Sequence, residues 1–248
     1  MLGIIGGTGL TQLENLEITH RQVIRTPYGD PSWALTFGNI KSHEVVFLAR
    51  HGYGHTIPPH LVNYRANLWA LHDQGVTEVV SVATVGGIDD ALIPGSIVIP
   101  DQIIDYTHGR KTTFHDGTDK PVTHIDFTEP YTQAMRDLCM RAVLEAGESC
   151  ANSGVYAAVQ GPRLETAAEI NRLDRDGATI VGMTGMPEAA LARELDMAYA
   201  AVCVVANHAA GRGNSVTGIH YDEIQAVVNL AMSRVRNILE HLVVIHGN

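Results

Sequence analysis

Two stretches near the start of the chain combine bare backbone with polar and positively charged side chains. The GGTG motif at residues 6–9 follows the short apolar run Gly3–Ile5, and Arg50-His51 follows Val45–Ala49. Glycine lets backbone N–H groups approach a ligand closely and form the concave turns that hold anions. At an exposed strand end, the arginine is expected to be a fork donor, and the histidine a second donor, for a tetrahedral oxyanion. These residue types predict a phosphate site.

Two later stretches have the same character. The sequence TVGG at residues 84–87 follows Val79–Ala83, and MTGMPE at residues 183–188 follows Thr179–Gly182. In the second stretch, Pro187 suits the first position of a helix, whose free N–H groups and dipole attract anions. Each loop alone could be an unliganded turn, but four such loops after predicted strands favour one shared anion site.

Other motifs for phosphate or metal fit the sequence less well. A dinucleotide-binding turn needs a third glycine where Gln12 stands, and a P-loop needs a lysine, whereas the first lysine of the chain is Lys41. The spacing of His51, His55 and His60 could suit zinc, but the HExxH arrangement is missing. We therefore expect no metal.

The sequence around these stretches alternates short apolar runs with amphipathic segments. The expected strands are Gly3–Ile5, Val45–Ala49, Val79–Ala83, Ile97–Ile99, Val155–Val159, Thr179–Gly182 and Ala201–Ala206. The expected helices are Leu61–Gln74, Pro130–Ala146, Pro187–Leu195 and Tyr221–Val244. Strands separated by helices predict an α/β protein with a mostly parallel sheet, whose ligands bind just beyond the carboxyl ends of the strands.

Length and composition narrow the class of protein. The 248 residues contain no linker-like, low-complexity or repeated segment, so we expect one domain over residues 1–248. The net charge of −10 argues against a nucleic-acid-binding surface. Cys139, Cys150 and Cys203 lack paired spacing, which suits a reducing compartment. Without a signal peptide or an apolar run of roughly 18 residues, we expect a cytoplasmic protein with no membrane partner.

Together the motifs resemble the purine nucleoside phosphorylase family of the trimeric type. The matching segments span nearly the whole chain and include GIIGGTGL, ARHG with His55, VNYRAN, TVGG, QGPRLET and MTGMPEA, and the first half resembles the methylthioadenosine phosphorylases in particular. The resemblance implies a single α/β domain with a central mixed sheet flanked by helices. It also implies that inorganic phosphate attacks the anomeric carbon of a purine nucleoside, without a cofactor, in a homotrimer with sites at the subunit borders.

The resemblance also assigns roles to individual residues. The residues that match the family's phosphate ligands are Thr8, Arg50, His51, Thr84 and Thr184. Met183 matches the methionine under the ribose, and Leu164 matches a position on the purine face that is usually phenylalanine. The expected chemistry is electrostatic, with a phosphate dianion beside an oxocarbenium-like sugar and a hydrogen bond to the departing purine.

Three positions around the expected base site distinguish the purines. Where the methylthioadenosine enzymes carry two aspartates, this chain has Asn207 and Ala209, and Glu165 stands in place of a small residue. The Glu165 carboxylate accepts from the N1–H of a 6-oxopurine but faces a lone pair on adenine N1. Asn207 can donate to O6 and accept from a protonated N7, which would stabilise the leaving base. Asn207 and the phosphate ligand His51 are the expected catalytic residues. Without the resemblance, a surface glutamate at a helix start and an asparagine ending a strand would explain both positions.

The sugar side of the site is expected to be methylthio-specific. His124-Ile125 resembles a pair that the methylthio enzymes extend into the site of an adjacent subunit, and Ile219 is the expected thioether contact. A 6-oxopurine with a methylthio sugar is S-methyl-5′-thioinosine, which phosphorolysis converts to hypoxanthine and 5-methylthioribose 1-phosphate. The alternatives are a methylthioadenosine phosphorylase, a general inosine/guanosine phosphorylase, or a nucleoside-binding protein without catalysis. His220 favours the second of these, because the inosine enzymes place a histidine near the 5′-hydroxyl.

Overall fold

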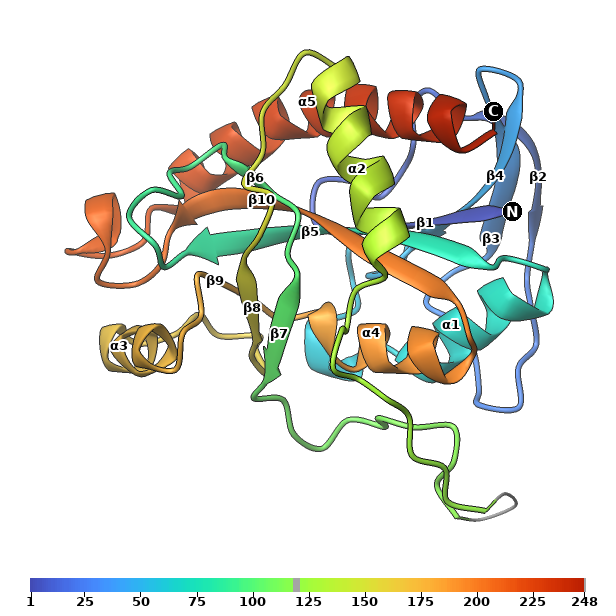
Figure 1. The fold of residues 1–248 in the computed structure, drawn as a ribbon, viewed down its shortest axis with the longest axis horizontal. Coiled ribbons are helices and arrows are strands. Elements are labelled where there is room, and N and C mark those ends of the chain that lie inside the picture. Colours follow the sequence, from blue (N-terminus) through green and yellow to red (C-terminus); the bar gives the residue numbers. More distant parts are fainter. Residues whose placement is uncertain (118–120, 248) are drawn as a thin grey trace.

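A mixed β-sheet runs through the molecule and carries helices on both faces (Figure 1). The computed structural model describes residues 1–117 and 121–247, and in this part of the chain the sheet has ten strands in the order β2-β3-β4-β1-β5-β9-β8-β7, with β10 pairing β5 and β6. The strands are β1 Leu2–Gly6, β2 Glu17–Gln22, β3 Leu35–Ile40, β4 His43–Ala49, β5 Glu78–Gly87, β6 Ile97–Val98, β7 Gln102–Asp105, β8 Val155–Ala158, β9 Ile180–Gly182 and β10 Ala198–His208. The helices are α1 Tyr64–Asp73, α2 Gln133–Glu145, α3 Ala167–Arg175, α4 Gly185–Glu194 and α5 Tyr221–Gly247, with 3₁₀ turns at Pro59–Leu61 and Gly213–Ser215. The expected single-domain α/β fold is confirmed.

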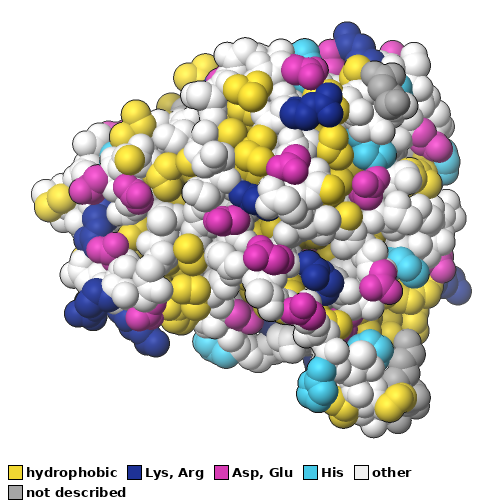
Figure 2. All heavy atoms as spheres, in the orientation of Figure 1, with side chains coloured by type: hydrophobic (Ala, Val, Ile, Leu, Met, Phe, Trp, Pro, Cys, Tyr) yellow, Lys and Arg dark blue, Asp and Glu magenta, His cyan; other side chains and the backbone are white. Residues whose placement is uncertain are grey.

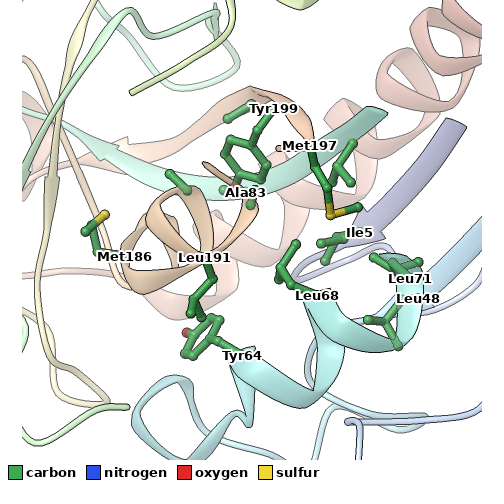
Figure 3. Packing of buried hydrophobic residues seen from close by; sticks show 14 of the residues in the cluster. Ile5, Leu48, Tyr64, Leu68, Leu71, Ala83, Met186, Leu191, Met197 and Tyr199 are labelled. Carbon is green, nitrogen blue, oxygen red and sulfur yellow. The ribbon is translucent and has the colours of Figure 1, made fainter. Parts of the chain in front are cut away.

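Each central strand buries both of its faces. Along β5, Val79 and Ala83 belong to the core between the sheet and helices α1 and α4, whereas Val80 and Val82 belong to the core between the sheet and helices α2 and α5. This period-two alternation between two apolar cores explains why the central strands read as continuous apolar runs. Figure 3 shows the first core, in which Leu68 of α1 lies beneath the sheet together with Leu191 of α4.

The carboxyl ends of several strands meet at one edge. Strands β4, β1, β5 and β10 are parallel neighbours in this order. The end of β5 also pairs with β9, where Gly86 lies opposite Val181. The loops that follow β1, β4 and β9 therefore converge beside the last residues of β5 and β10, as expected for a ligand site in an α/β sheet.

The two longest strands extend beyond their predicted ends. Thr84 pairs with Val204 inside β5, and Asn207 pairs with Gly86 inside β10. The expectation that both residues follow strand ends is therefore wrong. The apolar runs stop near these positions because the side chains there face a cavity, while the backbone continues to pair.

The remaining differences concern elements with weak apolar patterns. All six residues of β2 are exposed, so they lack the alternation that marks a half-buried strand. Helix α3, which was not expected, begins with a capping box between Thr166 and Glu169. Helix α1 begins at Tyr64 because the Asn63 side chain accepts from the Ala66 N–H. In α4, Met186 has φ −119° and ψ 140°, so regular helical backbone starts at Pro187, as the sequence predicts.

Residues 106–117 and 121–132, between β7 and α2, leave the body of the molecule and contribute to the protrusion in the lower part of Figures 1 and 2. Its base is held where Thr113 Oγ1 and the Phe114 N–H donate to the Glu194 carboxylate, at 2.6 Å and 2.7 Å. Farther along, Val122 and His124 are exposed. Figure 2 shows histidine and hydrophobic side chains on this protrusion, which we call the arm.

Candidate active site

A cavity of about 660 Å³ opens where the strand ends converge. The sequence-predicted residues on its wall are Thr8, Arg50, His51, Thr84, Leu164, Glu165, Met183, Thr184, Asn207 and Ala209. These residues come from loops or strand ends far apart in the chain, so the parallel sheet is what assembles them. The volume falls in the range typical of small-molecule sites.

Arg50 is the one arginine among the described residues of the cavity wall, and its side chain is fully buried. Its Nε and Nη2 donate to the two carboxylate oxygens of Glu188 at 2.7 Å and 2.9 Å, its Nη2 also donates to Ser81 Oγ at 2.5 Å, and its Nη1 donates to the Val82 carbonyl at 3.0 Å. These bonds use four of the five guanidinium N–H groups. The expectation of an exposed fork donor is therefore corrected: one N–H of Nη1 remains for a ligand.

The charge of Arg50 is balanced by Glu188. Burial disfavours the charged guanidinium, but the Glu188 carboxylate outweighs this effect and raises the pKa of Arg50. Tyr199 donates a further hydrogen bond to Glu188 Oε1 at 2.8 Å. The cation is thus fixed and neutralised within the protein before any ligand binds.

His51 lies beside this pair and is neutral. Its Nδ1 lies 2.8 Å from the Ile57 carbonyl oxygen, and because a carbonyl can only accept, Nδ1 carries the proton. Burial, followed by the charge of Arg50, lowers the pKa of His51 from 6.5 to about 4. At neutral pH the ring therefore offers Nε2 as an acceptor rather than a second positive charge.

The GGTG loop approaches Arg50 closely. A Cβ on Gly7 would lie 2.5 Å from the Val82 carbonyl oxygen and 2.9 Å from Arg50 Nη1, so no side chain fits at this position. Thr84 Oγ1 is 3.4 Å from the Thr8 carbonyl oxygen, which joins β5 to this loop. Across the cavity, the N–H of the buried Thr184 donates to the Tyr156 hydroxyl at 3.3 Å. Thr8, Thr84 and Thr184 thus share the cavity wall with Arg50.

The loop that carries Leu164 and Glu165 is fixed at both ends. At its start, Gly161 has φ +62°, and a Cβ there would lie 2.4 Å from Met183 Sδ, so glycine lets the loop approach Met183. At its end, the capping box of α3 holds Thr166, directly after Glu165. Burial, reinforced by the nearby Glu169, raises the pKa of Glu165 above its usual value.

The side chain of Asn207 is oriented by its neighbour. A bulge in β10 shifts the register between Val205 and Asn207, and it allows the consecutive residues Ala206 and Asn207 both to line the cavity. Asn207 Nδ2 donates to the His208 carbonyl oxygen at 2.7 Å. A flipped amide would place Oδ1 against that oxygen, so the bond fixes the orientation of the amide.

Two predicted site residues lie elsewhere. Ile219 is half-buried but is not among the described residues that line the cavity. Ile224 and Val228, which lie one helical turn apart on α5, line the cavity instead. His124 lies on the exposed arm and is also away from the cavity of its own chain. Other wall residues that the sequence analysis missed are Ile57 and Pro59, which come from a loop without an apolar pattern.

Two features are missing from the part of the chain that the structure describes. Over residues 1–117 and 121–247, no group of three or more His, Cys, Asp and Glu side chains is placed to hold a metal ion. In the same part of the chain, no helix combines the length and apolarity needed to cross a bilayer.

The protein has an α/β fold, and loops at the ends of its strands line a cavity of the size typical of small-molecule sites. The chain belongs to the Phosphorylase superfamily, because the model of that family matches residues 1–244. This membership confirms the resemblance inferred from the sequence and makes the chain an enzyme of the pentosyltransferase class.

Similar proteins carry more specific names. The chain is 50% identical over 233 residues, 94% of each protein, to the probable S-methyl-5′-thioinosine phosphorylase of Pseudomonas syringae pv. tomato. It is 45% identical to the probable 6-oxopurine nucleoside phosphorylase of Thermococcus kodakarensis, with 91% of this chain and 86% of that protein covered. Among solved structures, the methylthioadenosine phosphorylase of Schistosoma mansoni in complex with adenine superimposes with a TM-score of 0.95 at 30% identity, covering 99% of this chain and 91% of the other.

Proposed function

We propose that the enzyme cleaves S-methyl-5′-thioinosine with inorganic phosphate. A phosphate oxygen bonds to C1′ of the sugar, the bond from C1′ to N9 breaks, and the products are hypoxanthine and 5-methylthioribose 1-phosphate. The names of several relatives at 46–50% identity support this substrate. We also propose a cytoplasmic location and no cofactor beyond the co-substrate phosphate.

The orientation of the Asn207 amide is the observation that carries the choice of base. With one Nδ2 hydrogen held by the His208 carbonyl, the second N–H is free for O6 and Oδ1 is free for a protonated N7 of hypoxanthine. Glu165 on the same cavity wall accepts from N1–H when it is ionised. Adenine would meet two mismatches, because its N1 has a lone pair and its amino group is a donor.

Adenine nucleosides are the second candidate substrate class. The structural neighbour in complex with adenine supports it, since its fold matches this chain over nearly its whole length. Relatives in sequence include a probable 6-oxopurine nucleoside phosphorylase at 45% identity, however, so overall similarity extends to both purine classes. The base contacts depend on Glu165, Asn207 and Ala209. We therefore place the 6-oxopurine first.

Phosphate is proposed to bind between the GGTG loop and the start of α4. Thr8, Thr84 and Thr184 offer hydroxyls, and Arg50 offers its remaining Nη1 N–H. The neutral His51 can accept the hydrogen of a protonated phosphate oxygen at Nε2. A dianion held there would stabilise positive charge as it develops on the sugar.

The 5′ group is proposed to pack against Ile224 and Val228 in place of Ile219. We further propose a homotrimer in which the arm of one subunit brings His124 to the site of the next. The exposure of Val122 and His124 on the arm is what this assignment requires, because both side chains are accessible to a neighbouring subunit.

The test is phosphorolysis with product identification. The enzyme is incubated with S-methyl-5′-thioinosine with and without phosphate, and hypoxanthine and 5-methylthioribose 1-phosphate are measured by chromatography. We expect both products only when phosphate is present. Hypoxanthine release that is independent of phosphate, or no release at all, would reject the proposal.

A further inference from the structure

Arg110 lies at the base of the arm. It is not among the described residues that line the cavity, but its guanidinium contacts two loops that contribute residues to the cavity wall. Its Nη1 donates to the carbonyl oxygens of Met183 at 2.9 Å and Met186 at 2.6 Å. Its Nη2 donates to the carbonyl oxygens of Gln160 at 2.9 Å and Val159 at 3.3 Å. One planar group thus joins the loop after β9 to the loop after β8.

The same guanidinium reaches a third part of the wall through Tyr64. Arg110 Nη1 donates to the Tyr64 hydroxyl at 3.2 Å, and that hydroxyl donates to the Pro59 carbonyl oxygen at 2.9 Å. The guanidinium carbon also lies 5.5 Å from the centre of the Tyr64 ring. Tyr64, the first residue of α1, is buried beside Leu191 of α4, as Figure 3 shows. The hydroxyl that Arg110 contacts is therefore held in place by packing.

Arg110 is also tied to its own loop. Its Nε donates to Gln160 Oε1 at 3.2 Å, and the same oxygen accepts from the His108 N–H at 3.1 Å. The acceptors of Arg110 are therefore four backbone carbonyl oxygens and two side-chain oxygens, those of Gln160 and Tyr64. A lysine could not replace this pattern, because its three N–H donors sit on a single atom rather than on a planar fork.

The loops that Arg110 joins carry different parts of the proposed site. The loop after β9 carries Met183 and Thr184, which are assigned to ribose and phosphate, whereas the loop after β8 leads to Leu164 and Glu165, which are assigned to the base. Cleavage of the bond between sugar and base needs the two halves of the nucleoside to be held in register. A displacement of about 1 Å from the reactive geometry can cost roughly a hundredfold in rate.

We propose that Arg110 is a positioning residue that sets the separation of the base-contacting loop from the ribose- and phosphate-contacting loop. This inference rests on the proposed function, since that function assigns the two loops to the two halves of the substrate. Arg110 acts through carbonyl oxygens and Tyr64, without touching the substrate. Its loss should therefore loosen both loops together.

The experiment compares Arg110→Met with Arg136→Met. Arg136 is a matched control, because it also donates to backbone carbonyls, those of Pro100 at 2.9 Å and Asn152 at 2.5 Å, but it contacts no described residue of the cavity wall. Hydrogen–deuterium exchange of the ligand-free proteins reports on residues 159–165 and 183–187, and steady-state kinetics give kcat and KM for the nucleoside.

For Arg110→Met we expect faster exchange in both loops and a fall in kcat/KM of roughly tenfold to a hundredfold, carried mainly by kcat. Arg136→Met should leave exchange in these loops unchanged. If Arg110→Met does not fold, Arg110→Lys is measured in the same way and should show the same localised change. Unchanged exchange in the two loops, or an even increase over the whole chain, would overturn the inference. If the wild type cleaves no nucleoside, the proposed function fails, and the exchange result alone decides the role of Arg110.

Discussion

The Glu188 carboxylate holds the Arg50 guanidinium in a two-pronged ion pair in which both side chains are fully buried, with Nε–Oε2 at 2.7 Å and Nη2–Oε1 at 2.9 Å. A buried charge without a partner is costly, so each of the two residues is needed to keep the other charged inside the protein. The pair also limits what Arg50 can offer to a ligand, because four of its five N–H groups are already used. In the proposed phosphate site, the remaining N–H would act together with the hydroxyls of the cavity wall and the neutral His51.

This pairing predicts a large effect on stability. Arg50→Ala and Glu188→Ala should each lower the free energy of unfolding by about 3–5 kcal/mol, because each leaves an uncompensated buried charge. The measurement is urea denaturation followed by circular dichroism. Arg163→Ala is the control, because its ion pair with Glu169, at 2.7 Å, is largely exposed and should contribute less than about 1 kcal/mol. Equal small losses in all three variants would contradict the role of the buried pair.

A second prediction concerns the pH dependence of stability. The pKa of His51 is lowered from 6.5 to about 4 in the folded protein, so the unfolded chain takes up this proton first as the pH falls. His51 should therefore contribute stability that is present above pH 6.5 and is lost between about pH 6.5 and pH 4. Thermal denaturation at pH 7.5 and pH 5 should show a larger loss for the wild type than for His51→Asn, which has no titrating ring. The same loss in both proteins would refute the assignment.

The raised pKa of Glu165 predicts a base preference that depends on pH. As the pH falls through this raised value, the carboxylate becomes a carboxylic acid, which donates to adenine N1 rather than accepting from hypoxanthine N1–H. The ratio of kcat/KM for the 6-oxopurine over the 6-aminopurine nucleoside should therefore fall as the pH is lowered from neutral toward the acid limit of the enzyme's stability. Phosphate ionisation cancels because both substrates use the same co-substrate. In Glu165→Gln the ratio should not change with pH; a parallel decline in that variant would exclude Glu165 as the cause.

Subunit mixing tests the proposed homotrimer. Asn207→Ala removes a residue from the subunit's own site, whereas His124→Ala removes one proposed to act in the neighbouring site. Each variant alone should be nearly inactive, but mixed trimers should contain some sites with both residues and recover part of the activity. Subunit exchange is verified by native mass spectrometry. Exchange without recovery would argue against a shared site, as would full activity in a dilute monomer.

Most of the residues on the cavity wall that the sequence analysis singled out could be found because they lie in loops that follow apolar strands. Glycines, hydroxyls and charged residues placed after β1, β4 and β9 are visible in the sequence as interruptions of apolar runs. The positions of Thr84 and Asn207 within strands were not predictable in this way. Their strands continue beyond the apolar residues through backbone pairing, which side-chain periodicity does not report.

The supporting contacts could not be predicted from local patterns. Glu188 looks like an ordinary acidic residue in the first turn of a helix, and its partner Arg50 lies 138 residues away in the chain. Arg110 lies in a loop without periodicity, and its acceptors are carbonyl oxygens that have no signature in the sequence. Ile224 and Val228 were missed because the helical register of α5 decides which residues face the cavity.

The choice of base by Glu165 and Asn207 is tested most directly by comparing two nucleosides that differ only at the purine. Initial rates of S-methyl-5′-thioinosine and S-methyl-5′-thioadenosine cleavage are measured at pH 7.5 with saturating phosphate, and each reaction is repeated without phosphate. We predict that kcat/KM for the thioinosine is higher by orders of magnitude, because adenine would leave polar groups mismatched at both residues once the bound base covers them. Equal values, or a preference for the thioadenosine, would contradict this assignment of the base site.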